Sequence, residues 1–329
     1  MEALYIFSSG VLERKNNTIS IVNESGERKY LPVENVQEIH IFGEVDFNKR
    51  LLEFLTEKNI ILHIYNYYGY YSGSYYPREH YNSSFVLLKQ VEKYLNIEER
   101  LKIAKKIVYG AGKNIIRNLL DYKEKESSLI DIVEGIEELM KKIENASNIE
   151  ELMGIEANIR EAYYQSFDRI IKSNDFSMEK RTKRPPENEI NALISFGNSL
   201  LYTTVLSQIY QTHLDPRIGY LHTSNHRKFT LNLDIAEIFK PVIVDRLIFT
   251  LLNRKQITKK DFLKDMNGVF LNDKGRKTFV QEFNNKIETT VYSQKLKRNV
   301  SYRSLIRIEA YKIEKHIIND QEYFPYVRT

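Results

Sequence analysis

The chain has 329 residues, of which 42% are hydrophobic and 28% charged, the balance of a folded protein with material for two domains. It contains no cysteine, which excludes disulfides and thiolate metal sites. The net charge of +5 is compatible with a nucleic-acid partner without establishing one. We see no secretory signal and no run of about 18 apolar residues that would span a membrane. We therefore expect a cytoplasmic protein.

Residues 1–76 are predicted to be rich in β-strands. Short alternating runs are separated by turn sequences such as Lys15-Asn16-Asn17. The runs are Ala3–Phe7, Thr18–Val22, Ile39–Phe42 and Ile60–Tyr65. One amphipathic helix, near Asn48–Lys58, interrupts them. A small β-sheet or sandwich domain with one helix fits this pattern.

A tyrosine-rich hairpin follows at residues 66–77. Exposed tyrosines can stack on nucleic-acid bases, but they more often form a sheet face or a subunit interface. Residues 77–84, which include Pro77, are the predicted linker to an α-helical domain over residues 85–329.

The helix expected over residues 100–122 has an apolar stripe and a basic stripe. The apolar stripe consists of Ala104, Val108, Ala111, Ile115 and Leu119, and the basic one of Lys102, Lys106, Lys113 and Arg117 with Tyr109 among them. A basic face suits a phosphate backbone, although a solvated lysine face is the commoner explanation. Gly110 and Gly112 weaken the helix prediction.

Further helices are expected along the rest of the chain. They cover 127–144, a helix started by a Ser147–Glu150 capping box, 188–210, the neighbourhoods of 261–263 and 276–286, and 302–318. Residues 180–186 form a basic loop, either solvated or facing phosphate.

Glu156 is out of place on its helix, because it points with the apolar stripe. Arg160 lies four residues on, and such a pair on a helix contributes about 0.2–0.5 kcal/mol. A carboxylate on the buried face of a helix is better explained if a cation lies close to it.

The most informative segment is residues 219–241. His222 closes a short apolar turn, and Asp234 and Glu237 open an apolar helix that continues to Leu252. Carboxylates entering a buried helix must be paired, hydrogen-bonded or bound to a metal. One histidine with two acids is half of a plausible divalent-metal site. Asp-x-x-Glu ahead of an apolar run is equally a helix capping box, and His222 alone is more often structural, so both interpretations stay open.

Several separated motifs together resemble one family. They are Gly154-Ile-Glu156-Ala-Asn, Arg184-Pro-Pro-x-Asn188-x-x-Asn191, Gly219-Tyr-Leu-His222, Asp234-Ile-Ala-Glu237-Ile-Phe-Lys-Pro241, Asp245-Arg246 and Tyr302-Arg-Ser-Leu-Ile-Arg. In this order they resemble the CRISPR-associated adaptation nuclease, the metal-dependent integrase that inserts new spacers into CRISPR arrays. The match extends over essentially the whole chain.

The resemblance implies an α+β fold, with a small N-terminal β-sheet or sandwich domain followed by a larger all-α catalytic domain. Glu156, His222 and Glu237 match the family's metal ligands, and Asp234 matches its additional site acid. The family often has Asp where this chain has Glu237, which keeps the carboxylate and lengthens its reach. Oxygen ligands with one imidazole suit Mg²⁺ or Mn²⁺.

The implied reaction is transesterification, in which a DNA 3′-hydroxyl attacks a phosphodiester of the repeat. The implied partners are double-stranded DNA (spacer precursor and CRISPR repeat), a second copy that associates through the β-domain, and a small dimeric partner subunit. Candidates for DNA contact rest on charge alone, and they are Lys102, Lys106, Lys113, Arg117, Arg184, Arg227 and Lys228. The alternatives are a structure-selective nuclease acting on branched DNA and a non-catalytic DNA-binding scaffold.

Overall fold

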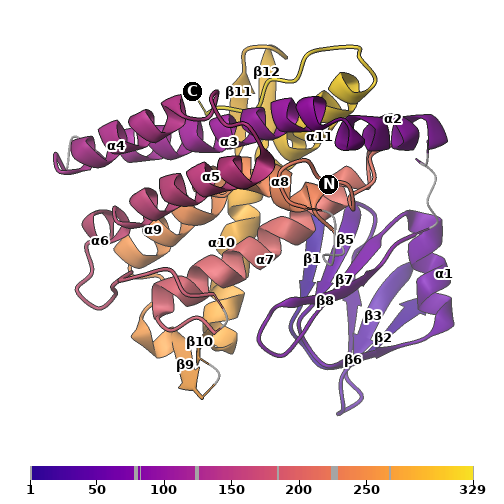
Figure 1. The fold of residues 1–329 in the computed structure, drawn as a ribbon. Coiled ribbons are helices and arrows are strands. Elements are labelled where there is room, and N and C mark those ends of the chain that lie inside the picture. The colour runs from indigo at the N-terminus through magenta and orange to yellow at the C-terminus, as the bar shows by residue number, and fades with distance from the viewer. Residues whose placement is uncertain are drawn as a thin grey trace. The chain divides into compact units, whose positions relative to one another are not determined.

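The computed structural model describes residues 2–77, 81, 83–122, 126–183, 185–223, 229–266 and 268–328. The chain divides into two compact units, Met1–His80 and Tyr81–Thr329 (Figure 1). The division falls inside the 77–84 segment predicted as the linker, of which residues 78–80 and 82 lie outside the described residues.

Over residues 2–77, the part of the N-terminal unit that the structure describes, there are two four-stranded sheets and one helix. One sheet has the order β1-β5-β7-β8 and the other β4-β3-β2-β6. The strands are β1 Glu2–Ile6, β2 Gly10–Lys15, β3 Thr18–Val22, β4 Arg28–Leu31, β5 Val36–Ile41, β6 Val45–Phe47, β7 Ile61–Tyr65 and β8 Tyr71–Tyr75. The helix α1 covers Lys49–Lys58 and starts where the Asn48 side chain accepts the Leu51 N–H.

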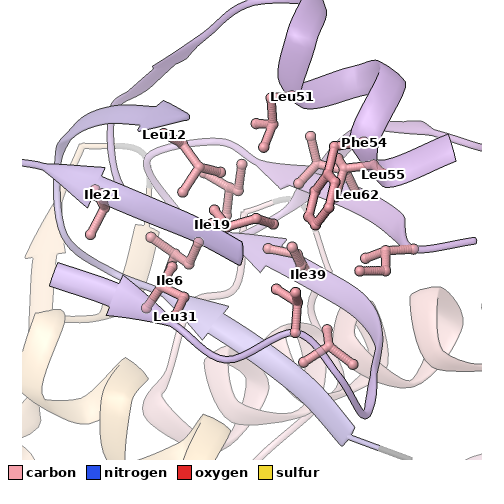
Figure 2. Packing of buried hydrophobic residues seen from close by; sticks show 14 residues of the cluster. Ile6, Leu12, Ile19, Ile21, Leu31, Ile39, Leu51, Phe54, Leu55 and Leu62 are labelled. Carbon is pink, nitrogen blue, oxygen red and sulfur yellow. The ribbon is translucent and has the colours of Figure 1, made fainter. Parts of the chain in front are cut away.

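Alternating side chains from both sheets meet α1 in one core (Figure 2). Leu12 and Ile19 come from one sheet, Ile39 and Leu62 from the other, and Phe54 from α1. Burying each of these side chains contributes about 1.5–3 kcal/mol. The apolar alternation seen in the sequence therefore marks the inner faces of the two sheets.

The tyrosine-rich hairpin is mainly a structural element. Its second strand, β8, pairs with β7, and the Tyr75 hydroxyl lies 2.6 Å from the Thr56 hydroxyl of α1. Tyr67, in the turn, remains 66% exposed. The sheet-face interpretation therefore accounts for the strand part of this segment.

The second unit is mostly helical. Its elements are α2 Ser84–Leu95, α3 Ile97–Leu120, α4 Leu129–Lys141, α5 Ile149–Tyr164, α6 Phe167–Ile170, α7 Glu189–Ile209, α8 Leu231–Phe239, a π-helical turn Pro241–Asp245, α9 Arg246–Asn253, a 3₁₀ turn Lys259–Asp261, β9 Phe262–Asp265, β10 Gly268–Leu271, α10 Asp273–Glu288, β11 Thr290–Ser293, β12 Arg298–Ser301 and α11 Tyr302–Ile317. Within this unit α3 packs against α2, α4, α5 and α8 (Figure 1). No helix among the described residues is long and apolar enough to cross a membrane.

The α+β fold class is confirmed: a β-sheet unit precedes a larger helical one. The second unit is not entirely helical, because β9 pairs with β10 and β11 with β12. The helix expected at Asp261–Leu263 is therefore wrong. The Asp261 carboxylate accepts the N–H of Thr258 at 2.8 Å and caps a single 3₁₀ turn, after which Phe262 enters β9.

Two helix starts differ from the sequence prediction. The capping box predicted for Ser147 and Glu150 is not formed: the N-cap of α5 is Asn148, which accepts the Glu151 N–H at 2.8 Å, and Glu151 accepts the N–H of the preceding Ser147 at 2.8 Å. The helix expected from Asp234 begins earlier, at Leu231. It is also interrupted by the π turn, because Pro241 has no N–H to donate.

The helix α3 runs unbroken through Gly110 and Gly112, and all five residues of its predicted apolar stripe are buried. A Cβ built on Gly110 would lie 2.6 Å from the Pro325 Cβ. The glycine therefore allows the C-terminal segment to pack directly on the helix backbone.

This packing yields a prediction that opposes helix propensity. Gly110→Ala gains up to about 1 kcal/mol of propensity but must push Pro325 aside, at an overpacking cost of about 1–3 kcal/mol. We expect a net loss of stability in urea denaturation followed by circular dichroism. Gly135→Ala on α4 is the matched control, because a Cβ there meets nothing within 4 Å, and it should stabilise the protein. Equal effects of the two variants would contradict this account.

Candidate functional site

The loop at residues 219–222 is folded around one buried carboxylate, Asp234 of α8. Its Oδ2 accepts the N–H of Tyr220 at 2.5 Å and of Leu221 at 3.0 Å. Its Oδ1 accepts the N–H of His222 at 3.0 Å and lies 2.7 Å from His222 Nδ1. The N-cap residue of α8 is Thr230 and Asp234 lies inside the first turn, so the capping-box alternative for Asp234 and Glu237 is excluded.

This contact fixes the state of the His222 ring. A carboxylate can only accept, so Nδ1 carries the proton and Nε2 is left as the atom able to bind a metal. Burial opposes the charged imidazole, but the hydrogen bond and charge of Asp234 outweigh it and raise the pKa of His222. Asp234 thus holds and orients His222 instead of facing the site itself.

The glycine that opens this loop is required by close approach. A Cβ on Gly219 would lie 2.8 Å from Asp234 Oδ2 and 2.7 Å from the Thr230 carbonyl carbon. The Gly219 N–H donates to the Thr230 hydroxyl at 2.8 Å. The Gly-Tyr-Leu-His motif therefore encodes a backbone wrapped onto the start of α8.

Glu237, one turn further along α8, is held by two buried cations. Arg160 Nη2 of α5 donates to Glu237 Oε2 at 2.6 Å, and Lys240 Nζ contacts Oε1. Burial alone would raise the pKa of Glu237, but Lys240 and Arg160 lower it to about 2. The sequence predicted a cation close to the inner-face carboxylate of Glu156. This cation is also Arg160, whose Nε lies 3.6 Å from Glu156 Oε1.

Glu156 and Asp245 are less well compensated. Burial first, and then the charge of Glu237, raise the pKa of Glu156 against the opposing effect of Arg160. Burial also raises the pKa of Asp245 to about 6, although Arg160 Nη1 lies 3.9 Å from its Oδ2. Within this set, which we call the buried charge cluster, three acids (Glu156, Glu237, Asp245) face two cations (Arg160, Lys240).

The predicted metal ligands are thus brought together from three segments. Arg160 bridges Glu156 and Glu237 at 3.6 and 2.6 Å. The charges of Glu237 and His222 shift each other's pKa and that of Glu156. Their ligand atoms do not all fall within 4.8 Å of one another, a spacing reached among the described residues by Glu38, His40 and His63 of the other unit. In this state the oxygens of Glu237 are engaged by Arg160 and Lys240.

The basic loop at residues 180–186 is tied to the start of α7. Asn191 accepts the Thr182 N–H at 3.1 Å and donates to the Lys180 carbonyl at 2.8 Å. This anchoring explains the asparagine in the Arg-Pro-Pro-x-Asn-x-x-Asn motif. Lys183 has an exposed surface, but neighbouring groups partly desolvate its ammonium. This desolvation first, and then the charges of Arg181 and Lys240, lower its pKa. The charges of Glu156 and Glu237 also act on it, so it lies near the site.

Three residues of the basic stripe of α3 have partners within the protein. Lys102 forms an ion pair with Glu99 at 2.7 Å, Lys106 pairs with Glu322, and Lys113 Nζ lies 5.6 Å from the Tyr109 ring centre. Arg117 is exposed. The other DNA-contact candidates, Arg184, Arg227 and Lys228, lie outside the described residues.

Comparison with known proteins identifies the family of the chain. Residues 4–285 match the model of the family described as CRISPR associated protein Cas1. The chain belongs to the Cas1 family. This confirms the resemblance to the CRISPR-associated adaptation nucleases.

Relatives of the family match over nearly their full length. A "CRISPR-associated endonuclease Cas1 2" of Thermodesulfovibrio yellowstonii is 56% identical, with 99% of this chain and 98% of the relative covered. A "CRISPR-associated endonuclease Cas1" of Thermotoga maritima is 54% identical over 98% and 99%. The solved structure of a Cas1 protein from Thermotoga maritima, 52% identical, matches with a TM-score of 0.89 over 99% and 100% of the two chains. A casposase bound to integration product shares the fold, with a TM-score of 0.83 at 20% identity over 99% and 93% of the two chains.

Lys240, Asp245 and Lys183 were not among the predicted site residues. The sequence could have indicated that Lys240 pairs with Glu237, because Lys240 lies three residues after Glu237 on the same helix face. No such spacing indicated that Asp245 belongs to the site, because a π-helical turn cannot be recognised in an apolar run of the sequence.

The role of Asp234 can be tested by an isosteric change. Asp234→Asn leaves buried N–H donors unpaired, at about 1–3 kcal/mol each, and removes the charge that raises the pKa of His222. We expect lower stability, and a lower His222 pKa in an NMR titration of the metal-free protein. Asp131→Asn on the exposed face of α4 is the control and should stay within about 0.5 kcal/mol. An unchanged His222 pKa in Asp234→Asn would refute the proposed contact.

Proposed function

We propose that this Cas1-family protein is a metal-dependent DNA endonuclease and integrase that inserts spacer DNA into CRISPR repeats. Family membership supports the nuclease assignment, since the similar relatives carry the name endonuclease. The observation that carries the proposal is the convergence of Glu156, Glu237 and His222 from three segments, with His222 Nδ1 engaged by Asp234.

The residues fit a divalent cation. The buried charge cluster has one acid more than it has cations, and Asp245 Oδ2 is buried without a hydrogen bond from the described residues. Carboxylate oxygens with one imidazole suit Mg²⁺ or Mn²⁺. Glu156, His222 and Glu237 would hold the ion, which supplies Lewis-acid stabilisation of a phosphoryl oxygen and activation of a hydroxyl.

The remaining residues prepare this site. Asp234 keeps the His222 Nε2 lone pair available, and Arg160 fixes the orientation of Glu237 at 2.6 Å. Lys183 offers an exposed positive charge beside the acids, where a DNA phosphate would need a counter-charge. In the proposed transesterification, a 3′-oxygen forms a bond to phosphorus as another P–O bond breaks, and the leaving oxygen takes up the proton. Hydrolysis is the same displacement by water.

The proposed partners follow from the family. They are double-stranded DNA, a second copy of this chain bound through the N-terminal unit, and a small dimeric subunit. Val11 and Tyr30 are exposed on the outer face of the β4-β3-β2-β6 sheet and are apolar side chains that a second copy would cover.

A strand-transfer assay tests the chemistry. On supercoiled plasmid carrying a repeat, with Mn²⁺, we expect Glu156→Gln and Glu237→Gln to lose strand transfer by about 100-fold or more, because even outer-shell partners of metal ligands cost about 10–100-fold. Glu161→Gln, on the exposed face of the same helix α5, is the control and should be fully active.

The same assay separates the alternatives. Donor ends without a 3′-hydroxyl must abolish joining by an integrase, whereas a structure-selective nuclease still cleaves branched DNA. If circular dichroism shows folded variants and both still join DNA like the wild type, the acids serve only structure and the proposal fails.

A second test concerns the DNA path. Lys183→Gln should weaken DNA binding and reduce the salt slope of log K by about 1, as expected for one lost phosphate contact. Lys102→Gln removes a similarly exposed charge that is paired with Glu99 and should change little. Fluorescence anisotropy at several salt concentrations measures both, and the reverse order would place DNA on the α3 face instead.

A further inference from the structure

A second group of potential ligands lies in the N-terminal unit. Glu38 and His40 are two residues apart on β5, and His63 of β7 is directly paired with His40 in the parallel register. Ile39, between the first two, points into the sandwich core. By strand alternation, Glu38, His40 and His63 therefore share the opposite face of the sheet.

These side chains are almost completely buried, with exposures of 1%, 1% and 0%. A buried carboxylate needs a compensating charge. Here both imidazoles turn the same atom toward it: His40 Nε2 lies 3.6 Å from Glu38 Oε1, and His63 Nε2 lies 3.8 Å from Glu38 Oε2.

The spacing is that of ligands around an ion. Both distances exceed the 2.7–3.2 Å of a hydrogen bond. Ligand atoms about 2.1 Å from a tetrahedral Zn²⁺ lie roughly 3.4 Å apart. One ligand atom from each residue lies within 4.8 Å of the other two, so little movement would bring all of them to one ion.

The outer nitrogens are oriented as in metal sites. His40 Nδ1 lies 2.8 Å from the Tyr65 hydroxyl, and His63 Nδ1 lies 2.7 Å from the Ser74 hydroxyl. The Ser74 hydroxyl is itself 2.8 Å from that of Tyr71. A metal-binding histidine typically donates its second N–H to such an acceptor, which fixes the ring.

Aromatic rings restrain the histidines further. Tyr5 stacks on His40 with ring centres 4.7 Å apart, and the two histidine rings lie 4.9 Å apart. Tight packing of this kind limits the rotation of both imidazoles. The Nε2 atoms are thus held in place before any ion arrives.

We propose that Glu38, His40 and His63 form a zinc site in the N-terminal unit, separate from the Glu156–His222–Glu237 site. Two imidazoles and one carboxylate are a zinc ligand set, whereas the oxygen-rich set of the other unit suits Mg²⁺ or Mn²⁺. The remaining coordination position is left to water or another group. Because the ligands come from β5 and β7, the ion would pin two neighbouring strands, which is a structural role.

Cobalt substitution in the full-length protein tests the site. The protein is made without a polyhistidine tag, stripped with a chelator, and carries Glu156→Gln and Glu237→Gln to remove the other site. We expect one equivalent of Co²⁺ to give visible d–d absorption, and Zn²⁺ to displace it. Adding Glu38→Gln should weaken Co²⁺ binding by about 100-fold or more, while Glu34→Gln, an exposed acid of the same unit, should leave it unchanged.

Two outcomes overturn the proposal: no stoichiometric Co²⁺ or Zn²⁺ binding in this background, or absorption indifferent to Glu38→Gln. Should Glu38→Gln not fold, X-ray absorption on the zinc-loaded parent decides without it. Two imidazole ligands are expected there. One or none would place the ion elsewhere, because His222 could supply only a single imidazole.

Discussion

Asp234 has no exposed surface, and the loop from Gly219 to His222 exists in its observed form because this carboxylate must be satisfied. Three backbone N–H groups and one imidazole N–H supply four donors. An unpaired buried charge would cost far more than the loop gains elsewhere. The same contact that stabilises the loop therefore sets the tautomer of His222, so stability and the preparation of the site are one interaction.

The buried charge cluster also pairs buried carboxylates with donors, but here the acids outnumber the cations. Arg160 touches Glu237, Glu156 and Asp245 at 2.6, 3.6 and 3.9 Å, so one guanidinium serves three acids. Removing one partner of a buried pair costs about 3–5 kcal/mol, because the other charge is left uncompensated. The cluster nevertheless leaves one acid in excess. An excess of one acid is what the divalent cation of the proposed function would neutralise.

The sequence predicts the parts of this arrangement that depend on local pattern. Glu156 stood out because it lay on the apolar stripe of its helix, and a β-rich region and a helical region were predicted on either side of residues 77–84. The partners could not be predicted in this way. Arg160 and Glu237 are 77 residues apart, and nothing in spacing indicates which buried acid a cation will choose. Asp-x-x-Glu fits a capping box and a loop anchor equally, and only the start of α8 at Leu231 decides between them. The role of Gly110 could not be predicted either, because the glycine is needed for contact with Pro325, more than 200 residues away.

The β5 strand shows why alternation is a weaker guide than it seems for polar residues. The pattern Glu38-Ile39-His40-Ile41 is that of a half-exposed strand, with the polar side chains in water. Instead Glu38 and His40 are as buried as Ile39 and Ile41. A sheet that buries both faces is expected to be apolar on both, and three ionisable groups on one of them oppose folding unless they are mutually compensated. Paired imidazoles directed at one carboxylate contribute to that compensation, and the proposed ion would add to it. Each unit of the chain would then stabilise buried charge with a bound ion, but with different ligands. The ligands around Glu156 are mainly oxygens and partly exposed, whereas those at His40 and His63 are mainly nitrogens and fully buried.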